Sequence, residues 1–168
     1  CASMVRDGPV VAGILPARVL VDLPNWVGDQ VMALPAVDRL VEGNASGLTV
    51  LSCRPTVRRL LERLYPGAVV VGSRRRVSPF RLAVDLHRRW GRFDLGVTLR
   101  HASRAKLLLR LAARRTVGSS GGGAGLLLSR SSPVDRSRHQ VCDHDPLLAA
   151  LGLRAVDPDW RPSLPEVL

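Results

Sequence analysis

The stretch Arg18-Val-Leu-Val-Asp22-Leu-Pro-Asn25-Trp-Val-Gly28-Asp29-Gln-Val-Met32 joins a short apolar run to the start of a helical pattern. Residues 18–22 fit a strand of a parallel sheet, because such strands are covered on both faces and read as continuous branched apolar runs. After a loop at residues 23–28, apolar residues recur every three or four positions from 31 to 41, which predicts a helix. Pro35 interrupts the pattern and indicates a kink or a local break within that helix.

The same alternation continues along the chain. Apolar runs predict further strands at residues 48–52, 68–72, 93–98 and 115–118, and the segments between and after them predict helices at 57–64, 80–90, 104–113 and 141–151. The Gly- and Ser-rich residues 119–138 indicate a long loop with one candidate strand at 126–128. Strands separated by helices form right-handed crossovers. We therefore predict an α/β fold, a Rossmann-like and mainly parallel sheet of at least five strands with helices on both faces.

Length and composition fit one such domain. The chain has 168 residues, of which 46% are hydrophobic, and no apolar run is long enough to cross a bilayer. We expect residues 1–17 to form a poorly ordered extension, 18–155 to form the domain, and the proline-containing residues 156–168 to be an extended linker with little packing of its own. Because Cys1 precedes Met4, residue 1 is not expected to be the native start.

The chain carries a net charge of +11, and Lys106 is the only lysine among its 25 basic residues. Guanidinium groups bind phosphates and carboxylates through paired hydrogen bonds. Such an excess attracts an anionic substrate, an acidic membrane surface or nucleic acid. Codon composition would also explain the preference for arginine, and the sequence leaves both explanations open. Three scattered cysteines do not suggest a disulfide scaffold, which favours a reducing cytoplasm.

The loop after the first strand is the best candidate for a site. Open α/β sheets bind ligands beyond the carboxyl ends of their strands, where helix N-termini offer free N–H groups. Gly28 either allows a tight turn or lets a ligand approach the backbone closely. Asp29 either caps the helix or acts on a substrate, and at such a position a cap is the commoner role.

Two other stretches invite an interpretation as sites. His139, Cys142, His144 and Asp145 lie close in sequence, but structural zinc needs four ligands with paired spacing, so we expect no metal site. The glycine-rich residues 119–125 match neither of the common phosphate-binding motifs. We interpret them as a mobile loop, and covering a substrate stays open as a second role because long loops in compact domains are often functional.

The segment Asn25-Trp-Val-Gly-Asp-Gln-Val-Met-Ala-Leu-Pro-Ala36 resembles the N-terminal signature of the lipopolysaccharide heptosyltransferases, glycosyltransferase family 9, and especially of heptosyltransferase II-like members. Residues 93–99, 115–118 and 139–152 resemble later segments of that family in the right order. The resemblance implies that this chain is the N-terminal half of a two-domain GT-B glycosyltransferase. It further implies that this half holds a lipid-linked sugar acceptor, and that a second domain binds a nucleotide-sugar donor, with ADP-heptose suspected.

The resemblance also implies roles for individual residues. Asp29 corresponds to the proposed general base, which would accept the proton of the acceptor hydroxyl as that oxygen attacks the donor with inversion. Besides these implied roles, we expect the acceptor to contact Asn25, Trp26, Gly28, Arg58, Arg59, Arg100 and Arg104. The four arginines are candidates because guanidinium groups bind phosphate and carboxylate, although for any one of them alone a solvated surface position is the commoner role. The segment after the fourth strand, Arg100-His-Ala-Ser-Arg104-Ala, matches the usual family pattern only at Arg104, so acceptor contacts there are expected to differ.

The resemblance therefore predicts a glycosyltransferase half that acts on a lipopolysaccharide inner-core or related glycan. It would work as a peripheral protein at the cytoplasmic face of the inner membrane, need no cofactor besides the donor, and be inactive alone. The alternative is a noncatalytic basic module that binds anionic glycolipid or nucleic acid. Because the sequence lacks aromatic platforms and nucleic-acid motifs, a nucleic-acid partner is not expected. A degenerate relative that binds the acceptor without transferring sugar is a third reading.

Overall fold

The computed structural model describes residues 15–73, 77–120, 125–132, 140–157 and 159–161 of the chain. Its strands are β1 (Arg18–Asp22), β2 (Leu48–Cys53), β3 (Val69–Gly72), β4 (Phe93–Thr98), β5 (Ala113–Ser119) and β6 (Arg130–Ser132). Its α-helices are α1 (Val27–Gly43), α2 (Arg58–Leu64), α3 (Pro79–Trp90), α4 (Ser103–Ala112) and α5 (Asp145–Ala150). One-turn 3₁₀ helices are η1 (Pro55–Val57), η2 (Gly125–Leu127) and η3 (Gln140–Cys142).

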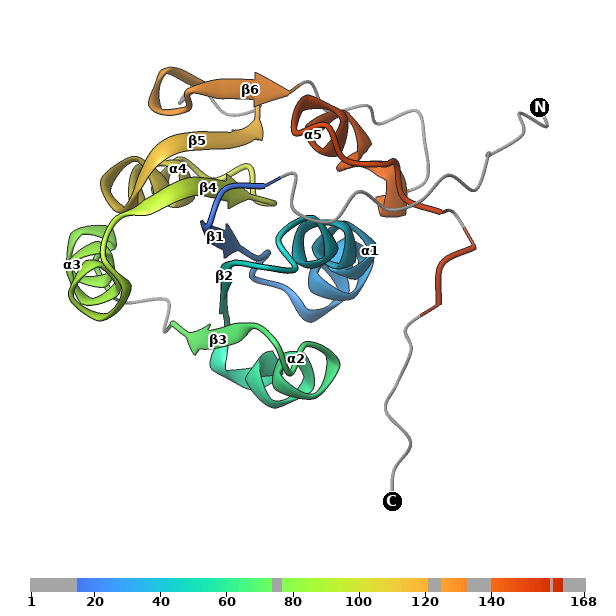
Figure 1. The fold of residues 1–168 in the computed structure, drawn as a ribbon, viewed down its shortest axis with the longest axis horizontal. Coiled ribbons are helices and arrows are strands. Elements are labelled where there is room, and N and C mark those ends of the chain that lie inside the picture. The colour runs from blue at the N-terminus through green and yellow to red at the C-terminus, as the bar shows by residue number, and fades with distance from the viewer. Residues whose placement is uncertain (1–14, 74–76, 121–124, 133–139, 158, 162–168) are drawn as a thin grey trace.

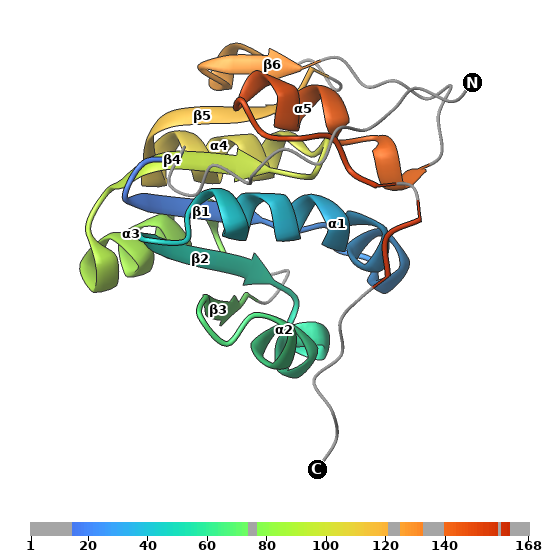
Figure 2. The same ribbon diagram turned by 45° about the vertical axis from the view of Figure 1, so that its right-hand side comes forward.

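These described strands form one parallel sheet in the order β3-β2-β1-β4-β5-β6, with helices on both faces (Figures 1 and 2). The predicted α/β, Rossmann-like and mainly parallel fold is thus confirmed. The first five strands lie within a few residues of the predicted limits. Pro35 lies inside α1, which continues through it as one helix. Among the described residues no helix is both long and apolar enough to span a bilayer.

Two predicted elements were placed wrongly. The sixth strand is β6 and not residues 126–128, which fall largely in η2. The side chain of Thr116 explains this shift, because its hydroxyl accepts from the Ser129 amide at 2.9 Å and donates to the Leu127 carbonyl at 3.2 Å. Ladder pairing with β5 therefore begins only at Arg130. The last helix is shorter than predicted because Pro146 stands in its first turn, where a proline begins a helix rather than continuing one.

Alternate residues of β1 face two separate cores. Val19 and Val21 lie fully buried beneath α1, α2 and α5, whereas Leu20 lies fully buried with Phe93 beneath α3 and α4. A strand covered on both faces is apolar throughout its middle, and in β1 only the terminal residues Arg18 and Asp22 are charged. This pattern explains why the limits of β1 were predictable from its sequence.

Parts of the expected extension and linker pack on the domain. Leu15 is buried, and its amide donates to the Gly43 carbonyl at 3.0 Å, while residues 1–14 lie outside the described part. Val156 is buried, and its amide donates to Asp145 Oδ1 at 2.8 Å. Trp160 packs on the core around α1, so the expectation of little packing does not hold for these two residues. Residues 158 and 162–168 are not among those described.

Asp38 on α1 joins this C-terminal segment to the domain. Its Oδ1 accepts from the Tyr65 hydroxyl at 2.5 Å, and its Oδ2 accepts from Trp160 Nε1 at 2.5 Å. We expect Asp38→Ala to lower the free energy of unfolding by about 2–3 kcal/mol, because both hydrogen bonds to a carboxylate are lost. Urea unfolding would measure this loss. Glu42→Ala on the same helix removes only an exposed ion pair with Arg39, and an equal loss there would contradict the role of Asp38.

Candidate functional site

The strand order reverses between β1 and β4. The chain first builds outward from β1 through β2 to β3, and then returns to place β4 against the other edge of β1. The loops that follow these two strands therefore leave the sheet in opposite directions. In open α/β sheets this point is the usual binding site for ligands. The N-terminus of α1 opens beside it.

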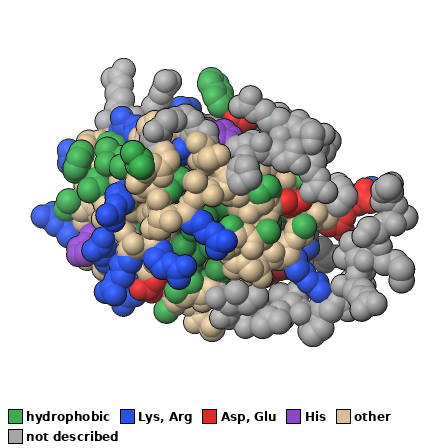
Figure 3. Space-filling view, turned by 90° about the horizontal axis from the view of Figure 1, so that it is seen from above, with side chains coloured by type: hydrophobic (Ala, Val, Ile, Leu, Met, Phe, Trp, Pro, Cys, Tyr) green, Lys and Arg blue, Asp and Glu red, His purple; other side chains and the backbone are tan. Residues whose placement is uncertain are grey.

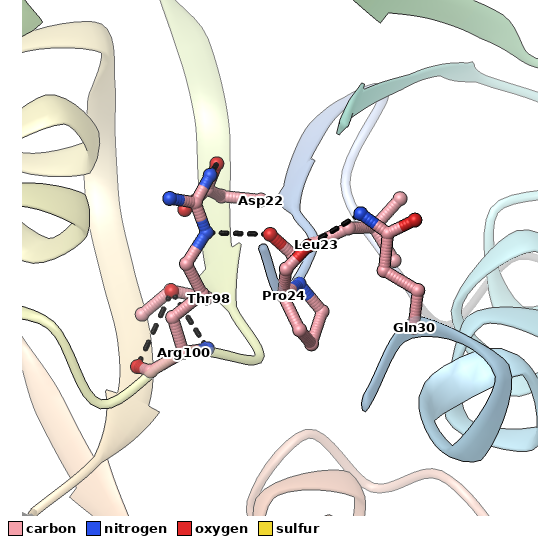
Figure 4. Close-up of polar contacts among 6 residues, drawn as sticks. All are labelled: Asp22, Leu23, Pro24, Gln30, Thr98 and Arg100. Carbon is pink, nitrogen blue, oxygen red and sulfur yellow. Dashed lines mark hydrogen bonds and ion pairs between the residues drawn. The ribbon is translucent and has the colours of Figure 1, made fainter. Parts of the chain in front are cut away.

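The side chain of Arg100 bridges this point from the β4 loop to the end of β1 (Figure 4). Its Nη2 donates to Asp22 Oδ1 at 2.8 Å, and its Nε donates to the Leu23 carbonyl at 2.5 Å. Its own amide donates to Thr98 Oγ1 at 3.1 Å. Arg100 is thereby held in one orientation. Its guanidinium reaches the surface, since the side chain retains 18% of its exposure.

Asp22 is the buried partner of this ion pair. Burial raises the pKa of its carboxyl to about 6, although the positive charge of Arg100 and hydrogen bonds from neighbouring side chains act to lower it. A carboxylate without solvent exposure needs a cation to stay ionised near neutral pH. Arg100 therefore stabilises the charge of Asp22, and Asp22 in turn fixes the position of Arg100.

Two pockets meet at Arg100. The first, of about 280 Å³, opens toward α3 and α4, and we call it the basic pocket; its polar lining residues are Asp22, Asn25, Ser73, Arg100 and Arg104. The second, of about 310 Å³, opens beside α1, and we call it the Asp29 pocket; its lining includes Asn25, Trp26, Asp29, Arg100, His101 and His144. Both are lined by Asn25, Arg100 and Ala102, so the two pockets adjoin at these residues.

Asp29 is the third residue of α1 and is exposed at the pocket. It makes no hydrogen bond or ion pair with any residue that the structure describes, and the side chain of the N-cap residue Trp26 makes no cap hydrogen bond. A carboxylate in the first turn is favoured by the helix dipole, but here it does not close a capping box. Both oxygens of Asp29 are thus available to a hydroxyl group in the pocket.

The other predicted residues fall into two groups. Asn25, Trp26, Arg100 and Arg104 lie at the two pockets, where Trp26 is 71% exposed and Arg104 donates to the Val77 carbonyl. Arg58 and Arg59 begin α2, beyond the end of β2, and neither lines these pockets. Arg58 forms an ion pair with Glu62 at 2.7 Å.

Gly28 is not required by its backbone conformation. A Cβ atom there would meet no atom within 4 Å, and φ is not positive. The tight turn that would demand glycine is therefore absent.

Two histidines that the sequence analysis did not place at the site, His101 and His144, line the Asp29 pocket. His101 Nδ1 lies 2.6 Å from Ser119 Oγ, and burial together with nearby His101 lowers the pKa of His144 to about 4. His101 adjoins Arg100 in the same loop, so its position was foreseeable, whereas His144 reaches the pocket only through the fold of η3 and α5. Among the described residues no three His, Cys, Asp or Glu side chains could share a metal ion. His139 lies outside those residues.

Comparison with known proteins finds similarity to heptosyltransferases. No protein-family model matches the chain. The curated lipooligosaccharide heptosyltransferase 2 of Campylobacter jejuni is 27% identical over 94 residues, which make up 56% of this chain and 29% of the relative.

Solved structures extend the likeness to the fold. E. coli ADP-heptose LPS heptosyltransferase II matches with a TM-score of 0.71 and 18% identity, over 89% of this chain and 47% of that one. The glycosyl transferase family 9 protein of Veillonella parvula matches with a TM-score of 0.73 and 16% identity, over 89% and 45%. The chain spans less than a third of the curated relative and about half of these structures. The resemblance to heptosyltransferases and the shared fold are thus confirmed.

Proposed function

We propose that this chain is the acceptor-binding half of an inverting, heptosyltransferase-like glycosyltransferase of lipopolysaccharide biosynthesis. The observation that carries the proposal is the meeting of Asp29 and Arg100 in one pocket at the reversal of strand order. The Asp29 carboxylate, which has no partner among the described residues, lies there beside a fixed cation, on a fold shared with heptosyltransferases. A transferase acting on a charged sugar needs both groups.

In this proposal the acceptor hydroxyl donates a hydrogen bond to the Asp29 carboxylate. The hydroxyl oxygen attacks the anomeric carbon of the donor, its proton passes to Asp29, and the nucleoside diphosphate leaves from the opposite face, which inverts the anomeric configuration. The donor, for which ADP-heptose is our proposal, is bound mainly by a second domain. No metal or further cofactor takes part.

Anionic groups of the acceptor are proposed to bind at the basic pocket. Arg100 and Arg104 supply guanidinium groups, and Asn25 lies between the two pockets. The exposed face of Trp26 provides an apolar platform for a sugar ring. Arg58 and Arg59, at the same edge of the sheet, are left to contact a more distant part of a lipopolysaccharide inner-core or related glycan.

The proposed partner is a lipid-linked sugar acceptor at the cytoplasmic face of the inner membrane, where the protein acts as a peripheral protein. A noncatalytic basic module is the second candidate, and the net charge of +11 is the observation that favours it. Salt-sensitive binding of random oligonucleotides by the chain, without any effect of sugar acceptors, would support that alternative.

Binding of an anionic sugar can be tested on the 168-residue chain. We expect glucose 6-phosphate to bind weakly, with an affinity that falls as salt rises, because exposed charges are screened. Arg104→Gln should weaken binding by about tenfold, since a charged hydrogen bond to phosphate is lost. Titration followed by NMR measures both effects.

Uncharged glucose and the variant Arg63→Gln are the controls for this titration. Arg63 is exposed on α2 and lines neither pocket. If glucose binds as well as glucose 6-phosphate, or if Arg63→Gln weakens binding as much as Arg104→Gln, the basic pocket is not the anion site.

A further inference from the structure

The helices on the two faces of the sheet differ in charge. The face covered by α3 and α4 carries five exposed arginines and one acidic side chain, Asp85, while the sixth basic residue, Lys106, is fully buried. The face covered by α1, α2 and α5 carries four basic and five acidic side chains. In Figure 3, many Lys and Arg side chains gather at the left, the side on which α3 and α4 lie in Figure 1. Among the described helices, the excess of basic over acidic side chains therefore lies in the layer formed by α3 and α4.

The exposed side of α3 combines large apolar side chains with arginines. Phe80 and Val84 retain 58% and 49% of their exposure, and they lie four residues apart, on one side of the helix. Arg88 continues the same row, and Arg81 lies next to it; both arginines are exposed. We call these four residues the α3 stripe. Meanwhile Ala83 and Leu86 bury the opposite side against the sheet, so the apolar side chains of the stripe are not needed for the core.

We propose that the α3 stripe, with α4 beside it, docks this protein on a lipid bilayer that carries anionic headgroups. Apolar side chains interspersed with arginines match the boundary of acyl chains and headgroups, where a helix lies parallel to the surface. Each arginine near such a surface adds attraction to anionic lipids. The inference rests on the proposed function in one respect, since a lipid-linked acceptor resides in a membrane.

The position of the stripe suits that acceptor. Pro79 and Leu82, which flank Phe80 on α3, line the basic pocket, and Arg104, Ala105 and Leu108 line it from α4. A headgroup at the membrane surface is therefore nearest to the basic pocket. Arg100 lines both this pocket and the Asp29 pocket beyond it. Nucleic acid would use the arginines but would leave Val84 without a role.

Flotation with vesicles that contain no acceptor sugar tests the inference apart from the transfer reaction. We expect the 168-residue chain to bind vesicles of phosphatidylglycerol and phosphatidylcholine, and to bind pure phosphatidylcholine at least tenfold more weakly. Phe80→Ser/Val84→Ser and Arg81→Gln/Arg88→Gln should each lower binding to the anionic vesicles by about tenfold or more. Circular dichroism verifies that both variants remain folded.

Matched control variants lie on the other face. Val31→Ser/Leu60→Ser and Arg39→Gln/Arg63→Gln remove the same kinds of side chain from α1 and α2, and they should bind vesicles like the unaltered chain. Equal losses in the controls, or undiminished binding by both stripe variants, would overturn the inference. So would binding of random oligonucleotides without binding of vesicles. Failure on vesicles leaves the transfer test with Asp29 variants unaffected, so the two proposals can fail separately.

Discussion

Replacing Asp29 by asparagine is expected to lower turnover by about 10²- to 10⁴-fold in a transfer-competent protein that joins this chain to the proposed donor-binding domain. Asparagine keeps the size and the hydrogen-bonding ability of the side chain but cannot accept the proton of the acceptor hydroxyl. Affinity for the acceptor and thermal stability should change little. Initial rates of sugar transfer, measured with saturating donor, provide the test.

Glu42→Gln is the matched control for this variant. It makes the same chemical change at the other end of α1, outside both pockets, and should leave turnover unaltered. A residue that only caps the helix would behave differently from a base. Turnover per folded molecule would then persist in Asp29→Asn, and the loss would appear as about 1 kcal/mol or less of stability. That outcome would remove Asp29 from catalysis.

Replacing Arg100 by glutamine is expected to lower the free energy of unfolding by about 2–4 kcal/mol at pH 8. The reason is that Asp22, which has no solvent exposure, loses the cation that stabilises its charge. Arg104→Gln is the matched control, because Arg104 is exposed at the same pocket and bonds only to a backbone carbonyl among the described residues. Its replacement should cost about 1 kcal/mol or less. Urea unfolding of both variants gives the comparison.

The pH dependence follows from the raised pKa of Asp22. A carboxyl whose pKa is about 6 in the folded state and 3.8 in its unperturbed state takes up a proton on folding between these values. The contribution of the Asp22 carboxyl to the free energy of unfolding is therefore greatest below about pH 4 and is lost as the pH rises through 6. Without Arg100 the pKa of Asp22 rises further. The difference in free energy of unfolding between Arg100→Gln and the unaltered protein should therefore shrink strongly from pH 8 to pH 5.

Comparing the two proteins at each pH cancels the titration of other groups. Asp22→Asn/Arg100→Gln should recover part of the stability, because no buried charge then remains. An equal loss at pH 5 and pH 8 would show that Arg100 acts through packing rather than through the charge of Asp22.

The sequence was most informative where local pattern alone decides the structure. The limits of β1 and β4 were predictable because both strands are buried on both faces and end at recognisable loops. The prediction from sequence failed at β6, because the hydroxyl of Thr116 on β5 binds residues 127 and 129 and strand pairing starts only after them. No local pattern contains that interaction, since Thr116 and Ser129 lie 13 residues apart.

The residues of the candidate site also divide into those that the local sequence identifies and those that only the fold brings together. Asp29 and Asn25 were identifiable because strand, loop and helix follow one another in sequence. The pairing of Asp22 with Arg100 was not, because 78 residues separate them and only the order of the strands brings β1 beside β4. Arg100 was predicted as a ligand of the acceptor alone, whereas part of its hydrogen-bonding capacity is already used by the protein.

The strand order also has a consequence for how the chain assembles. β1 emerges first during synthesis, β2 and β3 then add in turn to one side of it, and β4, β5 and β6 add in turn to the other. Each new strand thus meets a free edge, and none has to insert between two strands already paired. Parallel pairings fold slowly because each closes a long loop, and incomplete sheets expose edges that aggregate. In a nascent chain of this topology, each exposed strand edge can therefore be covered as soon as the next strand has been synthesised.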